Sequence, residues 1–413
     1  MASMKDLPEQ APLVLICLLD KADPPAESFI DGMLAAELPA VGCRVWMLCA
    51  RGEAGLRPRR YGHAVCLPWL RPRRGVGRFI NLPLAWWRVR RLQARARRRG
   101  LKVALLARND PIQLLAAALV RRAPARLVFQ QTFPHEHASH PWSKRTLARW
   151  LMRLASRRVD ALMAVSPLGL ERLRGYFPAG LPGIVVPLLV PAAERAAHVW
   201  PADTGPMRFV YMGTHDPDRR LDLVLEAIVE AVSRGAHVHF DFIGGRPDEL
   251  APLRCVTGVT ALEQAGRLRF ISPVPRSDMP ALLARYQVGL SLIPPLPIYR
   301  EASPTKLAEC MGAGLAVLAS RGIPLQERMV EDSGGGYLVD WEVSAMADAI
   351  VALSANQVWV RRMRERGWTY AREVLTYALL RRDIFSALWS DTEDKRFSTG
   401  HERPKDGRPL PWG

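Results

Sequence analysis

Short apolar runs alternate with amphipathic stretches along the first 190 residues. The runs that predict buried strands are residues 13–19, 44–49, 103–107, 126–130 and 161–165. The stretches whose apolar positions recur every three or four residues, and which predict helices, are 29–38, 112–120 and 146–157. This alternation is typical of a parallel sheet that is covered by helices.

The same alternation returns after residue 206. Strands are predicted at residues 209–212, 239–243, 268–271, 289–293, 316–319 and 337–339. Helices are predicted at residues 221–233, 279–286, 304–311 and 343–353. We therefore predict an α/β protein with two doubly wound, Rossmann-like domains, residues 1–190 and 206–370, joined by a segment rich in proline and alanine. Two such domains are expected to face each other across a ligand-binding cleft.

The C-terminal residues are expected to form a helix and a tail. Residues 370–389 have a helical pattern, and the part from 371 to 389 is expected to return to the N-terminal domain. Residues 390–413 combine few apolar residues with three prolines and many charges. This composition predicts a disordered tail.

The charge is distributed unevenly between the two halves. Residues 1–200 hold 32 basic and 13 acidic residues, a net charge of +19, whereas residues 201–413 hold 26 and 27, a net charge of −1. The N-terminal domain is therefore expected to face an anionic partner, either a membrane surface or nucleic acid. No apolar run is long enough to predict a transmembrane helix. The six cysteines have no zinc-binding spacing and are expected to be reduced thiols in the cytoplasm.

One basic segment concentrates this charge. Residues 71–100 contain 11 arginines and no acidic residue, with Trp86 and Trp87 among several apolar residues. Tryptophan and arginine together suit an element that lies at the surface of an anionic membrane, although a solvated basic helix and a nucleic-acid site are alternatives. The side chains expected to face the membrane are Trp86, Trp87, Arg90, Arg91, Arg97, Arg98 and Arg99.

The segment from Tyr299 to Gly314 contains the most informative candidate chemistry. Ser303 is a good N-cap and Pro304 suits the first helical position, so a helix is predicted to begin there. The amide groups of its first turn and the charge of Lys306 would attract a diphosphate. Glu301 and Glu309 lie on either side of this helix start, and carboxylates readily accept hydrogen bonds from sugar hydroxyls.

A second candidate segment follows the strand at residues 209–212. Gly213 lets a ligand approach the backbone, and Arg219 lies just before the next helix, where it would meet phosphate oxygens. A plain turn with surface arginines is the alternative. A third segment, residues 133–140, holds three histidines but no cysteine, and its His-x-His alternation is poor evidence for a metal. We predict no metal site.

Together these motifs resemble the retaining glycosyltransferases of family 4, which have the GT-B fold. The resemblance implies that Glu301, the first residue of a Glu-x7-Glu motif, contacts the donor sugar and that Glu309 contacts the nucleotide ribose. It also implies that Gly213, Thr214, Arg219, Ser303 and Lys306 surround the donor diphosphate, with Thr214 at a position where the family has arginine. A histidine that positions the sugar corresponds either to His135 or to Gln131.

The resemblance implies a reaction and a place in the cell. The enzyme would move a sugar, with retention, from a nucleotide diphosphate sugar to a glycan or lipid-linked acceptor. Its context would be cell-envelope polysaccharide synthesis at the inner face of the plasma membrane. It would need no metal or other cofactor, because basic side chains stabilise the leaving group. The alternatives are a nucleotide-sugar isomerase or hydrolase with the same fold, and a basic nucleic-acid-binding protein.

Overall fold

The chain forms two compact units. The computed structural model describes residues 13–23, 25, 27–52, 55–71, 79–134, 136, 140–191, 205–389 and 410–412. Unit 1 comprises residues 1–187, 377–403 and 412–413, and unit 2 comprises residues 188–376 and 404–411. The segment predicted to join the domains, and most of the predicted tail, lie outside the described residues. Two residues of that tail, Leu410 and Trp412, are buried, so the expectation of disorder does not hold for them.

Unit 1 is built on one eight-stranded sheet with the order β3-β4-β2-β1-β5-β6-β7-β8. All neighbouring strands are parallel except β3 and β4, which are antiparallel. The strands are β1 (Leu13–Ala22), β2 (Arg44–Ala50), β3 (Arg59–Tyr61), β4 (Ala64–Leu70), β5 (Lys102–Arg108), β6 (Arg126–Gln131), β7 (Ala161–Ala164) and β8 (Gly183–Val185).

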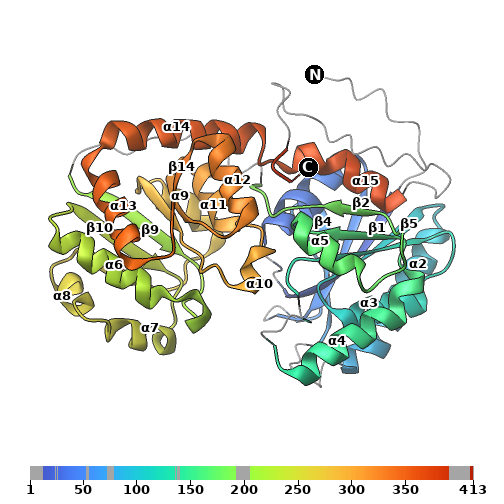
Figure 1. The fold of residues 1–413 in the computed structure, drawn as a ribbon. Helices are drawn as coiled ribbons and strands as arrows, with labels where there is room; N and C mark the ends of the chain where they lie inside the picture. The colour runs from blue at the N-terminus through green and yellow to red at the C-terminus, as the bar shows by residue number, and fades with distance from the viewer. Residues whose placement is uncertain are drawn as a thin grey trace. The chain divides into compact units, whose positions relative to one another are not determined.

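Helices cover both faces of this sheet (Figure 1). They are the π-helix η2 (Ile30–Glu37), α1 (Leu38–Ala40), α2 (Asn81–Arg97), α3 (Pro111–Val120), α4 (Trp142–Ala155), the 3₁₀ turn η4 (Ser156–Arg158), α5 (Pro167–Arg174), the 3₁₀ turn η8 (Tyr377–Leu380) and α15 (Arg381–Trp389). Alternate residues of the central strand β1, among them Val14, Ile16 and Leu18, are buried in a core cluster with residues of α2, α3 and α4. Both faces of β1 are buried, which explains its continuous apolar sequence.

Strand β4 was not predicted from the sequence, because Pro68 interrupts its apolar run. A proline cannot donate to a sheet ladder, so a run that contains one is a weak strand candidate. The structure accommodates Pro68 because β3 pairs only with Ala64, Val65 and Cys66. After Cys66, one edge of β4 has no partner strand among the described residues. Because no strand at that edge needs a donor, the N–H group that Pro68 lacks does not cost a hydrogen bond.

The single helix predicted over residues 370–389 is wrong. Helix α14 (Gln357–Glu373) ends in unit 2, and the chain resumes helical structure only at η8 and α15, which belong to unit 1. The interruption has a physical cause: Val190 donates its N–H to the carbonyl of Leu375 (3.1 Å), and Val190 forms a parallel bridge with Thr376. A residue in such an extended pairing cannot also continue a helix.

Unit 2 is built on a six-stranded parallel sheet with the order β11-β10-β9-β12-β13-β14. The strands are β9 (Met207–Met212), β10 (Val238–Ile243), β11 (Leu268–Ile271), β12 (Val288–Ser291), β13 (Ala316–Ser320) and β14 (Gly336–Val339). All six predicted strands of this half are present. The order reverses between β9 and β12, which is the arrangement of a Rossmann fold.

The helices of unit 2 lie on both faces of its sheet (Figure 1). They are η6 (Pro217–Arg219), α6 (Leu221–Ser233), α7 (Pro247–Arg254), α8 (Val259–Gln264), η7 (Arg276–Asp278), α9 (Met279–Leu283), α10 (Pro297–Arg300), α11 (Thr305–Gly312), α12 (Pro324–Ser333), α13 (Val343–Ala355) and α14. Within the described residues, no single helix is long and apolar enough to cross a bilayer. Helices α13 and α14 have the required length and apolarity only when they are counted together, and the two are bent by 98° relative to each other.

Tyr377 fastens the returning C-terminal segment inside unit 1. Its ring packs edge-on against Phe29 with centroids 6.0 Å apart, and its hydroxyl hydrogen-bonds the hydroxyl of Ser28 (3.2 Å). A Cβ atom at Gly32 would lie 2.3 Å from the ring, so only glycine allows this approach.

We predict that Tyr377→Ala lowers the free energy of unfolding of unit 1 by ~3–5 kcal/mol, because it leaves a cavity at a fully buried ring. Urea denaturation followed by circular dichroism measures the change. Leu56→Ala, at an exposed position of the same unit, is the matched control and should shift the transition by less than about 0.5 kcal/mol. An equally small effect at Tyr377 would contradict its role in holding the segment.

Candidate functional site

The reversal of strand order in unit 2 places the candidate site at the carboxyl ends of β9 and β12. Ligands bind at such reversal points because the loops that follow the two strands diverge to opposite faces of the sheet. Gly213 follows β9 directly, and α10 and α11 follow β12. The sequence-predicted residues Gly213, Thr214, Arg219, Glu301, Ser303, Lys306 and Glu309 all lie in these segments.

Gly213 leaves room for the side chain of Lys306. Its φ angle is +134°, in the region that favours glycine. A Cβ atom at this position would lie 2.7 Å from Lys306 Cε and 2.8 Å from Lys306 Nζ. The end of β9 therefore tolerates no side chain while Lys306 crosses it.

Lys306 is held by an aromatic partner that the sequence did not indicate. Its Nζ donates a hydrogen bond to Tyr211 Oη (2.7 Å) and lies 4.0 Å from the centre of the Tyr211 ring. The Tyr211 hydroxyl in turn donates to the carbonyl of Thr214 (2.9 Å). This chain of contacts fixes the ammonium group beside the turn at Gly213.

Burial, and next the like charge of Arg219, lower the pKa of Lys306 to about 7. Asp216, Glu309 and Cys310 act in the opposite direction, but they do not offset the loss of hydration. The protonation state of Lys306 near neutral pH therefore depends on what binds next to it. An anionic ligand would favour the ammonium form.

Arg219 lies on the 3₁₀ turn η6, at the other side of Gly213. Its guanidinium group stacks 4.8 Å from the centre of the Tyr299 ring, and its Nε lies 3.9 Å from Asp216 Oδ2. Thr214 donates its hydroxyl to the same carboxylate (2.7 Å). Arg219 and Lys306 are close enough for the guanidinium to depress the lysine pKa, so the turn gathers two positive charges.

His215 supports this turn from beneath. The side chain is buried, its Nδ1 donates to the carbonyl of Gly213 (2.9 Å), and its ring packs edge-on against Tyr211. Burial lowers the pKa of His215, which favours the neutral ring. His215 therefore holds the turn in place and does not supply a charge.

The prediction that Ser303 caps the following helix is wrong. Helix α11 begins at Thr305 with Pro304 in the N-cap position, and no side chain caps it. The Ser303 hydroxyl instead accepts a hydrogen bond from the N–H of Leu188 (2.8 Å). Lys306 still lies in the first turn of α11, where backbone amides have no acceptor within the helix.

The two glutamates occupy different environments. Glu309 points to η7, where Arg276 Nη1 lies 3.1 Å from its Oε1. Glu301 is partly buried directly after α10. Arg276 was missed in the sequence, because it lies 33 residues from Glu309 and only the fold brings the two side chains together.

The second candidate for a sugar-positioning residue, Gln131, is committed to other contacts. It ends β6 in unit 1, donates to Glu136 Oε2 (3.0 Å) and accepts from Arg172 Nη2 (2.9 Å), and Arg172 also pairs with Glu136. The oxygen and the nitrogen of the Gln131 amide therefore both have partners. His135, the alternative, lies outside the described residues.

Unit 1 has a polar cluster of its own at the carboxyl ends of β1 and β5, where its strand order reverses. Arg108 is fully buried and pairs with Asp20 (3.3 Å) and Glu27. Asn109, with a φ angle of +59°, donates to the second oxygen of Asp20 (3.0 Å). The sequence alone did not predict this cluster, although the charged residues at the end of β1 were a signal for it.

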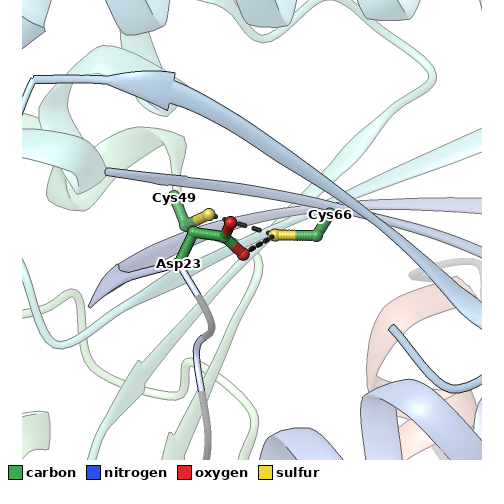
Figure 2. Close-up of side chains that lie close together, drawn as sticks. All are labelled: Asp23, Cys49 and Cys66. Carbon is green, nitrogen blue, oxygen red and sulfur yellow. Dashed lines mark hydrogen bonds between the residues drawn. The ribbon is translucent and has the colours of Figure 1, made fainter. Parts of the chain in front are cut away.

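Figure 2 shows a third cluster, in which Asp23, Cys49 and Cys66 converge from three segments of unit 1. The Cys66 thiol donates to Asp23 Oδ1 (3.1 Å) and lies 3.3 Å from the sulfur of Cys49. Three possible metal ligands thus lie within 4.8 Å of one another. Arg59 donates twice to the same oxygen of Asp23 (2.6 and 3.0 Å) and compensates its charge. These hydrogen bonds and the ion pair all converge on Asp23 Oδ1, whereas Asp23 Oδ2 is buried without a hydrogen-bond partner among the described residues.

Helix α2 contains the basic segment, and its two tryptophans differ. Trp87 is exposed, with the guanidinium groups of Arg88 and Arg91 4.6 and 4.7 Å from its ring. Trp86 instead packs against the core of unit 1, so the prediction that both rings face outward is wrong. Adjacent residues on a helix point about 100° apart, which prevents both from facing the same way.

The basic residues of α2 differ in their contacts as well. Arg90 lies over the Trp86 ring (5.1 Å), whereas Arg97 donates to the carbonyls of Arg122 and Ala123 (2.7 and 2.9 Å). Arg98 donates to the carbonyl of Ala94 (3.4 Å). The exposed basic residues on α2 and the turn after it are Arg90, Arg91, Arg95, Arg97, Arg98 and Arg99.

The two Rossmann-like units define the class of this protein as GT-B. Solved structures with the same fold include sucrose-phosphate synthase from Thermosynechococcus elongatus, with a TM-score of 0.69 and 16% identity over 91% of this chain and 98% of that one. HepE from Anabaena, in complex with UDP and glucose, has a TM-score of 0.67 and 15% identity over 91% and 99%. Trehalose 6-phosphate synthase from Burkholderia multivorans has a TM-score of 0.64 and 13% identity over 92% and 96%.

Two family models identify the chain more closely. The model for Glycosyltransferase Family 4 matches residues 32–188, and the model for Glycosyl transferases group 1 matches residues 206–356. No curated protein matches the chain in a sequence comparison. The chain is a glycosyltransferase of the family 4 type.

We predict that a diphosphate binds at Gly213 with uptake of a proton. Because the pKa of Lys306 is lowered to about 7, raising the pH above 7 removes the ammonium group, and the affinity should fall by up to about tenfold per pH unit. Calorimetric titration with inorganic pyrophosphate, in buffers with different ionisation enthalpies, measures both the affinity and the number of protons taken up on binding.

Lys306→Arg is the matched control for this titration. Arginine stays charged throughout the range, so any pH dependence that remains in the variant belongs to pyrophosphate itself. If the wild type and the variant show the same pH dependence, Lys306 does not titrate on binding.

Proposed function

We propose that this chain is a retaining glycosyltransferase that moves a sugar from a nucleotide diphosphate sugar to a glycan or lipid-linked acceptor. The supporting observation is the pair of cations, Arg219 and Lys306, gathered around Gly213 where the strand order of unit 2 reverses. The match to glycosyltransferase family models and the UDP and glucose bound by HepE agree with such a donor. The pathway we propose is cell-envelope polysaccharide synthesis.

In the proposed reaction the bond between the anomeric carbon and the diphosphate oxygen breaks as the acceptor oxygen bonds to the same face of that carbon. The acceptor proton passes to the departing phosphate. Arg219, Lys306 and the first-turn amides of α11 stabilise the developing negative charge. No metal ion or other cofactor takes part, because these groups supply the positive charge.

The remaining residues position the donor. Glu309, oriented by Arg276, accepts hydrogen bonds from the ribose hydroxyls, and Glu301 holds the sugar. Of the two candidates in unit 1, His135 suits direct contact with the sugar better than Gln131, whose amide is held by Glu136 and Arg172.

We further propose that the enzyme acts in the cytoplasm, at the inner face of the plasma membrane, with α2 facing the lipid. In support, Ile80 and Trp87 are exposed beside an open groove of about 510 Å³, lined by Arg71, Ile80, Pro83, Leu84 and Trp87. Each basic residue near an anionic surface adds about 1 kcal/mol of attraction.

A screen of nucleotide sugars tests the donor. One nucleotide sugar is expected to protect the protein against thermal unfolding selectively, by ~2.7 kcal/mol at a hundred times its Kd. With an acceptor, NMR of the product should show the anomeric configuration of the donor. Consumption of the donor without an acceptor would point to an isomerase or hydrolase instead, and the absence of any selective protection would favour a nucleic-acid-binding protein.

Kinetics of glutamate variants test the two carboxylates. Glu309→Ala should raise the donor KM roughly tenfold to a hundredfold, because a charge-assisted hydrogen bond of ~1.5–3 kcal/mol is lost. Glu301→Ala should lower kcat more than it raises KM, because the sugar is misoriented as its bond breaks. Arg276→Met should raise the donor KM less than Glu309→Ala does.

Helix α14 offers a matched control for these variants. Glu365 and Glu373 have the same spacing but are exposed, and their alanine variants should have wild-type kinetics. Wild-type kinetics in both Glu301→Ala and Glu309→Ala would exclude the proposed roles.

A further inference from the structure

Helix α4 of unit 1 is apolar on two faces. Its inner face packs Ala148, Leu151, Met152 and Ala155 into the unit. Its outer face exposes Leu147 (37%), Trp150 (57%) and Leu154 (57%), and Trp142 (75%) is exposed at the first position of the helix. A helix at the surface of a soluble domain normally has one apolar face, so the second needs a partner.

The exposed apolar residues of the outer face form a continuous stripe along the helix. Leu147, Trp150 and Leu154 are spaced three and four residues apart, which puts them on one side of the helix. Exposed basic residues flank the stripe, namely Lys144, Arg153 and Arg157. Residues 142–158 contain no aspartate or glutamate.

Helices α2 and α3 extend this surface. Helix α3 packs between α2 and α4 (Figure 1). Leu119 on α3 is 55% exposed, and Ile80 and Trp87 at α2 are also exposed. We call the exposed apolar residues of this layer the outer patch; they are Ile80, Trp87, Leu119, Trp142, Leu147, Trp150 and Leu154.

The outer patch lies in a strongly basic region. Residues 79–158 contain 18 lysines and arginines and two acidic residues, Asp110 and Glu136. Both acids are buried: Asp110 caps α3 by accepting the N–H of Ile112 (3.0 Å), and Glu136 pairs with Arg172. No acidic side chain of this region therefore reduces the positive charge at the surface.

From these observations we infer that the outer face of α4 inserts into an anionic lipid bilayer and is the main membrane anchor of the enzyme. Aromatic and aliphatic side chains on one face, with basic residues along its sides, are the features of an interfacial helix. This inference deepens the proposed membrane association, which named α2 alone. In this arrangement, α2 contributes mainly electrostatic attraction to the anionic lipid, and α4 contributes the apolar contact with the bilayer.

Other partners fit the outer patch less well. A second copy of the chain would bring two strongly basic surfaces together, and like charges repel. Nucleic acid would match the charge, and bases would stack on tryptophan, but Leu147 and Leu154 offer no stacking surface. A bilayer satisfies both the apolar stripe and the basic residues.

Sedimentation with vesicles of phosphatidylcholine, with and without phosphatidylglycerol, tests the inference at low and high salt. The wild type should bind only the anionic vesicles. The double variant Trp150→Ser/Leu154→Ser should lose more than about tenfold in affinity, because two side chains no longer leave water. Val358→Ser, at a 62% exposed apolar position on α14 in unit 2, is the matched control and should bind like the wild type.

A charge variant separates the two helices. Replacing Arg90, Arg91, Arg98 and Arg99 with glutamine should weaken binding at low salt and have little effect at high salt, where exposed charges are already screened. Arg97 is left intact because it holds two backbone carbonyls. Equal loss at both salt concentrations in this variant, with normal binding by Trp150→Ser/Leu154→Ser, would assign the anchor to α2 and overturn the inference.

A fluorescent label reports insertion directly. Leu147→Cys in a Cys255→Ser background, which removes the exposed native thiol, is labelled with an environment-sensitive dye. Its emission should shift to the blue with anionic vesicles and not with neutral ones. No shift, or a self-association in analytical ultracentrifugation that Trp150→Ser/Leu154→Ser abolishes, would overturn the inference.

Activity on a short water-soluble acceptor distinguishes this inference from the proposed reaction. The α4 double variant should keep that activity, since its substitutions are exposed and lie in unit 1 outside the donor site. Loss of vesicle binding with full activity supports the anchor. An inactive wild type that still binds vesicles through α4 would reject the proposed reaction while leaving the anchor intact.

Discussion

Lys306 crosses the end of strand β9 only because residue 213 has no side chain. A Cβ atom there would overlap the lysine, and the ammonium group would then lose both Tyr211 and the turn. The rest of the candidate site depends on this approach. Tyr211 and His215 hold the turn from below, and Arg219 adds a second charge that is supported by Tyr299. The result is a turn at a glycine that holds two basic side chains close together.

In unit 1, the point where the strand order reverses has the opposite charge arrangement. There the arginine, Arg108, is fully buried and its charge is matched by Asp20 and Glu27. Removing one partner from such a buried group is costly, because the other is left without compensation. The two carboxylates are therefore held rigidly at the carboxyl ends of β1 and β5. One unit presents positive charge at its strand ends and the other presents carboxylates, although both have the same kind of fold.

Much of the fold was predictable because buried parallel strands have continuous apolar sequences. All eleven predicted strands overlap a strand of the structure by most of their length, although the one at residues 289–293 extends past β12 into the following loop. Strands β3, β4 and β8 were missed: β3 and β8 have three residues each, and β4 contains Pro68, which is tolerated because the partner β3 is short. The break between α14 and α15 was missed for a related reason. The bridge between Val190 and Thr376 joins residues far apart in the sequence.

The sequence by itself determined the two α/β units, the uneven charge, and the segments around Gly213 and Lys306, because these depend on local periodicity, composition and motif spacing. Only the tertiary structure decided which side chains meet. It paired Glu309 with Arg276, moved Ser303 from a cap to a contact with Leu188, packed Trp86 against the core of unit 1 and exposed the second apolar face of α4. Such contacts depend on how distant segments pack, and a periodic pattern shows that a residue is apolar without showing what covers it.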